Sequence, residues 1–210
     1  MSRLLTKLEF ALDQGLPGEQ AHDELTPMKR GRTSDALVKA KNPRKSSVAI
    51  VLREVQSRLD CYLIQRPSYK GVHSAQVSFP GGKMEESDAD LEHTARRETE
   101  EEIGLPQQAG KLITLLTEVY IPPSNFIVTP HLFSIDEYYP LKADEREVDE
   151  IITFNALQLL DDSIIKKTDI RTSNGIVLKN IPYFDIHDKV VWGATAIILS
   201  ELKVIMKRVF

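Results

Sequence analysis

The chain has 210 residues, of which 41% are hydrophobic, and this is enough for one domain with a buried core. Its net charge of −4 leaves no basic footprint for nucleic acid, and its single cysteine, Cys61, excludes an internal disulfide and fits a reducing compartment. No apolar run approaches the roughly 18 residues of a membrane span, and the N-terminus lacks a signal-peptide core. We therefore expect a cytoplasmic protein that binds neither membranes nor nucleic acid.

Residues 1–46 predict a helix followed by an extended arm, both outside the main domain. The helix is expected over 2–14, where apolar side chains recur on one side at Leu4, Leu5, Leu8 and Leu12. Residues 17–46 are polar and contain prolines, which is typical of a segment that wraps a domain. Residues 47–210 are then expected to form the domain itself.

The domain is expected to alternate strands with helices. A continuous apolar run at 47–54 predicts a strand buried on both faces, and 60–65 predicts its hairpin partner. Further strands are expected at 111–120, 126–135, 176–178 and 181–186. A short helix is expected at 155–160, and a longer one from 193 to about 207, where small residues allow close packing on the sheet.

An acidic helix is expected between the hairpin and the later strands. Ser87 or Asp88 can cap its start, and apolar residues recur along it at helical spacing. Gly104 stands where a left-handed C-cap is favoured, and Pro106 follows just beyond. Both ends of this helix are therefore predicted from ordinary capping signals.

Carboxylates on one face of this helix point to a divalent cation. At about 100° per residue Glu98, Glu101 and Glu102 share one narrow arc. Their mutual repulsion, a few tenths of a kcal/mol per pair, would become attraction around Mg²⁺, which takes oxygen ligands beside substrate phosphates. Arg97 lies one turn before Glu101 and could hold that carboxylate. For an isolated charge run the alternative is a solvated acidic face.

The order and spacing of these residues resemble the Nudix box, G-x5-E-x7-R-E-U-x-E-E-x-G-U with U apolar. Residues 81–105 read GGKMEESDADLEHTARRETEEEIGL. From Gly82 to Arg97 is fifteen residues, one more than the usual pattern, so the box glutamate has no direct counterpart and Asp88 is the nearest acid. Thr99 replaces the first apolar residue of the box.

Four further runs resemble the coenzyme A pyrophosphatases of the Nudix superfamily. Two of them, LIQR at 63–66 and HSAQVSFPGG at 73–82, are similar to the additional motif that precedes the box in those enzymes. The other two, IPPSNFIVTP at 121–130 and VWGATAIIL at 191–199, are also similar to that subfamily, and its box tends to have the longer acidic loop. This sequence departs from the subfamily motif at three positions, where Gln65 replaces a threonine, Pro67 a serine and Ala75 a glycine.

This resemblance implies an α/β fold, a Nudix-type α/β/α sandwich with a mixed β-sheet. It implies a pyrophosphohydrolase that splits coenzyme A or acyl-coenzyme A into 3′,5′-ADP and 4′-phosphopantetheine. The implied cofactor is Mg²⁺ or Mn²⁺, held by Glu98 and Glu102 with help from Glu101 and the carbonyl of Gly82. Dimerisation is common in the superfamily, so a homodimer is a further expectation.

The remaining roles follow from the same resemblance. Glu101, or a carboxylate outside the box, would take the proton of the attacking water, and Glu147 and Glu150 are the outside candidates. Arg97 would orient Glu98, Glu101 or both. The substrate would be contacted by polar residues just before the glycine pair, of which the cations suit phosphate: Arg66, Lys70, His73 and Gln76.

Two alternatives stay open. The first is a Nudix hydrolase that acts on ADP-ribose or another nucleoside diphosphate derivative. The second is a module that keeps the fold and senses a nucleotide without cleaving it. The complete set of box carboxylates argues against the second, because a pure binder does not need all of them.

Overall fold

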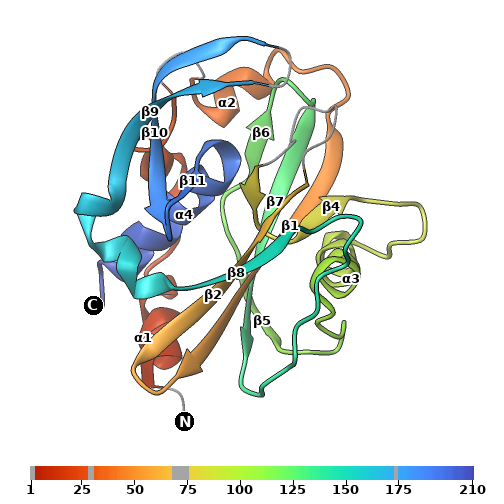
Figure 1. Ribbon diagram of the computed structural model, residues 1–210, viewed down its shortest axis with the longest axis vertical. Coiled ribbons are helices and arrows are strands. Elements are labelled where there is room, and N and C mark those ends of the chain that lie inside the picture. The colour runs from red at the N-terminus through yellow and green to blue at the C-terminus, as the bar shows by residue number, and fades with distance from the viewer. Residues whose placement is uncertain (1–2, 28–30, 68–75, 173–174) are drawn as a thin grey trace.

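A mixed sheet lies at the centre of the computed structural model, which describes residues 3–27, 31–67, 76–172 and 175–210 (Figure 1). Within these residues the sheet has eight strands, in which β3, β2, β1, β7 and β5 are neighbours in that order, β4 also pairs with β1, β6 with β7 and β8 with β2. The strands are β1 Arg44–Val55, β2 Arg58–Gln65, β3 Val77–Ser78, β4 Gly81–Lys83, β5 Lys111–Leu115, β6 Val119–Ile121, β7 Phe126–Ile135 and β8 Glu150–Asn155.

The central strand β1 is buried on both faces, as its apolar run predicts. Ala49 and Val51 point into one hydrophobic cluster, whereas Ile50 and Leu52 point into another. The β1–β2 hairpin is antiparallel and β1–β7 is parallel, so the sheet is mixed. β1 begins at Arg44, three residues earlier than predicted, because its first residues pair with β7 from Phe126 onward.

Helices cover the two faces of this sheet. Helix α3 (Leu91–Ile103) buries Ala95 and Ile103 in the cluster that contains Ala49 and Val51. Helix α4 (Gly193–Met206) buries Leu199 and Leu202 in the opposite cluster. The predicted α/β/α sandwich with a mixed sheet is therefore confirmed.

A second sheet of three strands packs beside α4 in the described part of the chain: β9 Ile165–Arg171, β10 Val177–Ile186 and β11 Lys189–Val191. The two strands predicted at 176–178 and 181–186 are one strand, β10, with a register irregularity between Leu178 and Ile181. Strand β9 was not predicted, because its mostly charged and polar residues carry little apolar periodicity.

Two other element predictions were wrong in detail. The strand expected at 111–120 is two strands, β5 and β6, which both pair with β7. The helix expected at 155–160 is a 3₁₀ helix, η2 (Ala156–Leu160), with Asn155 capping its start. A second 3₁₀ turn, η3 (Asp162–Ile164), follows it.

The N-terminal segment packs on the sheet and on α4. Its elements are α1 (Arg3–Leu12), η1 (Gly18–His22) and α2 (Thr33–Leu37). Leu5 and Leu8 of α1 join the cluster beneath α4, and the carboxylate of Glu54 accepts the first N–H groups of α1. A domain boundary near residue 46 stays a prediction. No helix in the described ranges is long and apolar enough to cross a membrane.

Candidate active site

Helix α3 carries the predicted carboxylates, and its ends are held by one predicted and one unpredicted cap. Gly104 is left-handed, with φ of 71°, and its N–H bonds to the carbonyl of Glu100, as predicted. The N-cap is Asp90, whose carboxylate accepts the N–H of His93 at 2.8 Å. The expectation that Ser87 or Asp88 caps the helix was wrong, because Asp88 is turned toward Arg97.

Asp88 and Arg97 form a buried bidentate pair. Arg97 Nε donates to Asp88 Oδ1 at 2.9 Å, and Nη2 donates to Oδ2 at 3.0 Å. The carboxylate of Asp88 also accepts the N–H of Glu85 and the hydroxyl of Thr94. The side-chain hydrogen bonds from Arg97 hold the pKa of Asp88 well below its usual range, despite burial. This pair ties the acidic loop to the helix.

Arg97 also reaches two of the predicted metal ligands. Its Nη1 lies 3.0 Å from Glu98 Oε1 and 3.0 Å from Glu101 Oε2, while Nη2 donates to the carbonyl of Lys83 at 3.3 Å. The Glu101 side chain is 57% exposed, so it can reach a molecule outside the helix. One guanidinium therefore orders Asp88, Glu98 and Glu101 together.

The glycine pair brings the backbone against the helix. A Cβ added at Gly82 would lie 2.3 Å from Cδ and Oε1 of Glu98, so only glycine leaves room for that carboxylate. Gly81 has φ of 151°, and a Cβ there would lie 2.3 Å from the carbonyl oxygen of Ser47 on β1. Glycine is therefore required at these two positions for different reasons. Gly82 makes space for the carboxylate of Glu98, whereas Gly81 allows β4 to pair closely with β1.

Glu102 is almost fully buried and has a donor on each carboxylate oxygen. Arg66 Nη1 donates to Oε1 at 3.0 Å, and the N–H of Gly81 donates to Oε2 at 2.8 Å. Burial raises the pKa of Glu102 to about 7, although Arg66 opposes the shift. Burial also raises the pKa of Glu98, and the negative charges of Glu101 and Glu147 add to that rise.

The loop after β7 brings a fourth carboxylate toward this group. The N–H groups of Lys142 and Asp144 bond to the last carbonyls of α3, at Ile103 and Glu102. This docking leaves Glu147 exposed and close enough for its charge to raise the pKa of both Glu98 and Glu102. The other outside candidate, Glu150, is paired with Lys189 at 2.6 Å.

The predicted substrate contacts are only partly described. The guanidinium of Arg66 donates a hydrogen bond to Glu102, and the backbone N–H of Arg66 donates to the backbone carbonyl of Gln76 at 3.0 Å. Lys70 and His73 lie outside the described residues. Among the described residues, the hydroxyl of Ser78, two residues beyond Gln76, is buried and has no hydrogen-bond partner. Sequence reasoning did not single out Ser78, because a lone serine in a strand carries no functional pattern.

The donor set suits a hard divalent cation in its chemistry. Glu98 and Glu102 are oxygen donors whose like charges oppose each other in a water-poor setting, and Gly82 leaves room beside Glu98. Across the described ranges no three His, Cys, Asp or Glu side chains converge as a ready-made metal cage. Arg66 and Arg97 each contact a carboxylate that a metal ion would need.

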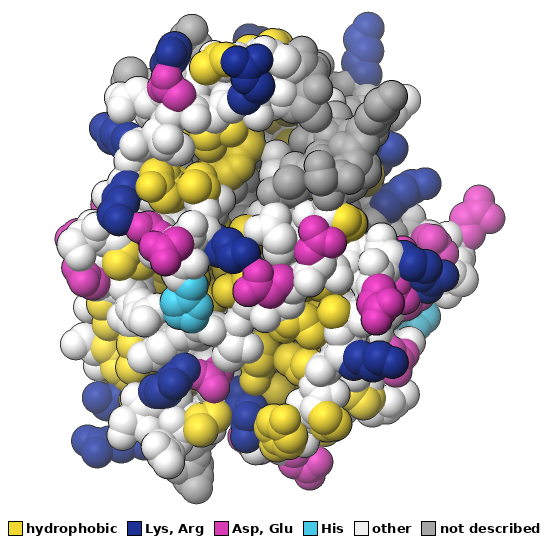
Figure 2. Space-filling view, in the orientation of Figure 1, with side chains coloured by type: hydrophobic (Ala, Val, Ile, Leu, Met, Phe, Trp, Pro, Cys, Tyr) yellow, Lys and Arg dark blue, Asp and Glu magenta, His cyan; other side chains and the backbone are white. Residues whose placement is uncertain are grey.

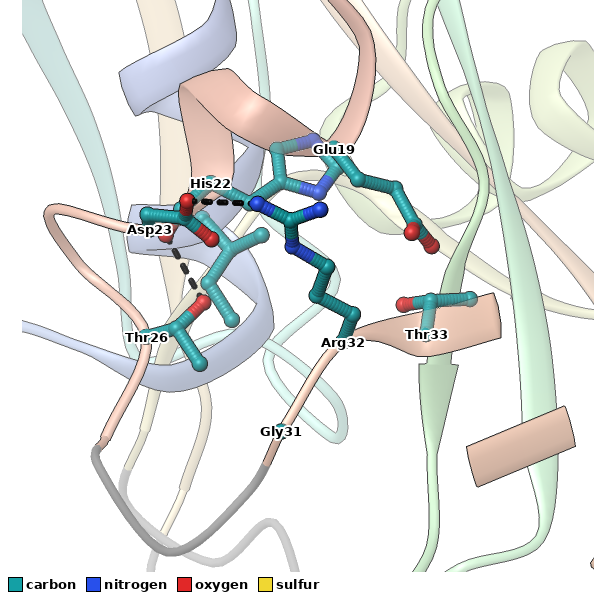
Figure 3. A pocket seen from close by; sticks show the side chains of 8 residues that line it. Glu19, His22, Asp23, Thr26, Gly31, Arg32 and Thr33 are labelled. Carbon is teal, nitrogen blue, oxygen red and sulfur yellow. Dashed lines mark hydrogen bonds and ion pairs between the residues drawn. The ribbon is translucent and has the colours of Figure 1, made fainter. Parts of the chain in front are cut away.

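A small pocket lies elsewhere, between the N-terminal segment and α4 (Figure 3). Arg32 and Asp23 form an ion pair at 3.0 Å there, and the Thr26 hydroxyl donates to the carbonyl of His22. None of its lining residues is a predicted site residue. On the face in Figure 2, basic and acidic side chains are interspersed, with no extended basic patch among the coloured residues.

Comparison with known proteins identifies the family of the chain. The family model of the NUDIX domain matches residues 43–170. Two relatives, each named Uncharacterized Nudix hydrolase NudL, from Salmonella dublin and Salmonella heidelberg, are both 33% identical, covering 78% and 77% of this chain and 83% and 82% of theirs. A solved structure, a MutT/nudix family protein from Enterococcus faecalis, is 16% identical with a TM-score of 0.48, covering 90% of this chain and 70% of that one.

The chain therefore belongs to the NUDIX domain family. It is a Nudix hydrolase, an enzyme of the pyrophosphohydrolase class. Enzymes of this family act on small nucleotide derivatives and generally use divalent metal ions such as Mg²⁺ or Mn²⁺.

Proposed function

We propose that this enzyme cleaves the pyrophosphate of coenzyme A or acyl-coenzyme A, with Mg²⁺ or Mn²⁺, to give 3′,5′-ADP and 4′-phosphopantetheine. The observation that supports the chemistry is that Arg97 contacts both Glu98 and Glu101, while Glu102 of the same helix accepts the backbone N–H of Gly81. The assignment of coenzyme A as substrate is based on four sequence runs that resemble coenzyme A pyrophosphatases, at 63–66, 73–82, 121–130 and 191–199.

In this proposal each residue of the chain has a distinct task. Glu98 and Glu102, with Glu101 and the Gly82 carbonyl, would hold the metal ion, which when bound neutralises charge on the diphosphate and activates a water. Arg97 keeps Glu98 and Glu101 in position because Asp88 holds its other edge.

The proton of the attacking water needs an acceptor. Glu101 and Glu147 are exposed carboxylates on the rim of the same group, and either can serve as the base. Substrate phosphates would be met by Arg66, Lys70, His73 and Gln76, which precede the glycine pair in the chain.

The second candidate is a Nudix hydrolase for ADP-ribose or another nucleoside diphosphate derivative. It uses the same carboxylates, so it differs only in what the substrate loop accepts. A nucleotide sensor without catalysis is the third, and it would bind one of these compounds without releasing products. A homodimer in the cytoplasm remains part of the proposal.

The test is a product analysis with purified protein. Coenzyme A, acetyl-coenzyme A, ADP-ribose and NADH are incubated in parallel with Mg²⁺ or Mn²⁺, and the products are resolved by mass. We expect 3′,5′-ADP and phosphopantetheine to form fastest. Preferred cleavage of ADP-ribose would support the metal ligands proposed on α3 but contradict the assignment of coenzyme A as substrate. Binding of one compound without cleavage would favour the nucleotide sensor.

The metal assignment is tested with Glu102→Gln, and Glu100→Gln is the matched control. Glu100 lies on the same helix but is exposed and bonded to Gln107, so its loss should leave turnover near the wild-type value. Glu102→Gln should abolish turnover while the protein stays folded. Activity of the wild-type level in that variant would contradict the metal assignment.

A further inference from the structure

The Arg66–Glu102 contact gives Arg66 a partner that the phosphate-binding expectation did not include. Arg66 follows the end of β2, and its Nη1 lies 3.0 Å from Oε1 of Glu102. The Glu102 side chain is 1% exposed and that of Arg66 is 25% exposed. A nearly buried carboxylate is thus neutralised by a cation that still touches solvent.

From this geometry we infer that Arg66 is an exchangeable counter-ion of Glu102, which competes with the divalent metal for that carboxylate and turns to the substrate phosphate once the metal is bound. The inference rests on the proposed function, because it requires that Glu102 is a metal ligand. It adds a regulation of that site, in which metal affinity is lowered by a residue that is not itself a ligand.

The surroundings of Glu102 favour an exchange over a permanent ion pair. The other carboxylate oxygen, Oε2, is held by the N–H of Gly81 at 2.8 Å, so the carboxylate keeps its orientation when Arg66 leaves. A guanidinium on a partly exposed side chain can swing toward solvent, where a phosphate offers the same bidentate match as a carboxylate. Metal and guanidinium both carry positive charge, so they disfavour each other at one carboxylate.

The exchange predicts how metal binding responds to the charge at position 66. Binding is measured through the electron paramagnetic resonance signal of free Mn²⁺, at pH 8.5 under argon. Arg66→Gln should lower the Kd for Mn²⁺ about tenfold, because binding no longer gives up a charge-assisted hydrogen bond, and tenfold corresponds to about 1.4 kcal/mol. Arg66→Lys keeps the charge and should stay within about threefold of wild type.

The matched control is Arg58→Gln, which removes the same charge from the exposed start of β2 and should leave the Kd unchanged. An unchanged or higher Kd in Arg66→Gln would overturn the inference, as would equal tightening in Arg66→Lys. Glu102→Gln separates the two proposals. If it weakens Mn²⁺ binding while Arg66→Gln does nothing, only the counter-ion role fails; if it leaves Mn²⁺ binding intact, the metal assignment fails as well.

Discussion

Asp88 and Arg97 are joined by two hydrogen bonds of 2.9 and 3.0 Å, across nine positions of the chain. This pair connects the acidic loop before α3 to the carboxylates of that helix, because Nη1 of the same guanidinium contacts Glu98 and Glu101. Asp88 occupies the loop where the longer box spacing leaves no direct counterpart for the box glutamate. It is therefore a positioning residue for the carboxylates.

Replacing Asp88 tests that role. Asp88→Asn removes the buried carboxylate that accepts two hydrogen bonds from Arg97 and leaves that guanidinium only its contacts with Glu98 and Glu101, so the free energy of unfolding should fall by about 3 kcal/mol. Turnover should fall as well, since Arg97 would no longer hold Glu98 and Glu101 in place. Urea denaturation and steady-state kinetics measure both effects. The control Glu86→Gln, an exposed acid of the same loop, should change stability by less than about 0.5 kcal/mol.

The two glycines should separate function from stability. In Gly82→Ala the atoms nearest the new methyl belong to the end of the flexible Glu98 side chain, so the fold should survive while metal binding and turnover fall. In Gly81→Ala the methyl meets the backbone of β1 and φ is unfavourable, so stability should fall by more than about 2 kcal/mol. Thermal unfolding and Mn²⁺ titration of both variants give the comparison. Equal stability loss in the two would contradict this reading of the site.

The raised pKa of Glu102 predicts a pH dependence of stability in EDTA. Unfolded Glu102 titrates near 4.5 and folded Glu102 near 7, so between these values the folded state holds more protons. The free energy of unfolding should therefore fall as pH rises from 4.5 to 7, by about 3 kcal/mol from this group, and stay level outside that window.

The matched variant isolates this contribution. Glu102→Gln cannot ionise, so wild type should lose stability relative to the variant between pH 4.5 and 7. Urea denaturation at half-unit pH steps measures the difference. Parallel profiles for the two proteins would show that Glu102 is not held in a water-poor setting.

Metal binding should stabilise the fold. At a Mn²⁺ concentration about 100 times Kd, the native state should gain about 2.7 kcal/mol, and EDTA should remove this gain. At one fixed Mn²⁺ concentration the gain should be smaller at pH 6 than at pH 8, because protonated Glu102 must release its proton before it can bind a metal, which raises the apparent Kd. Calorimetry of wild type and Glu102→Gln checks both points. The same gain in the variant would place the metal elsewhere.

Much of the fold was predictable because its signals are local. The apolar run of β1, the bounds of β7 and the C-cap at Gly104 all depend on a few consecutive residues, and the structure confirms them. Strand β9 and the division between β5 and β6 were missed, because pairing partners rather than periodicity define them. The cap assigned to Asp88 was wrong because Arg97 competes for the same carboxylate and binds it at two atoms.

The chemistry of the helix follows from residue spacing, since 3.6 residues per turn bring Glu98, Glu101 and Glu102 to one side in any helix with this sequence. The partners of those carboxylates depend on the path of the folded chain. Arg66 meets Glu102 across 36 positions because β2 ends beside α3, and the loop bearing Glu147 docks on the last turn of that helix. Periodicity within one element carries no information about such contacts, because they arise only when separate elements pack.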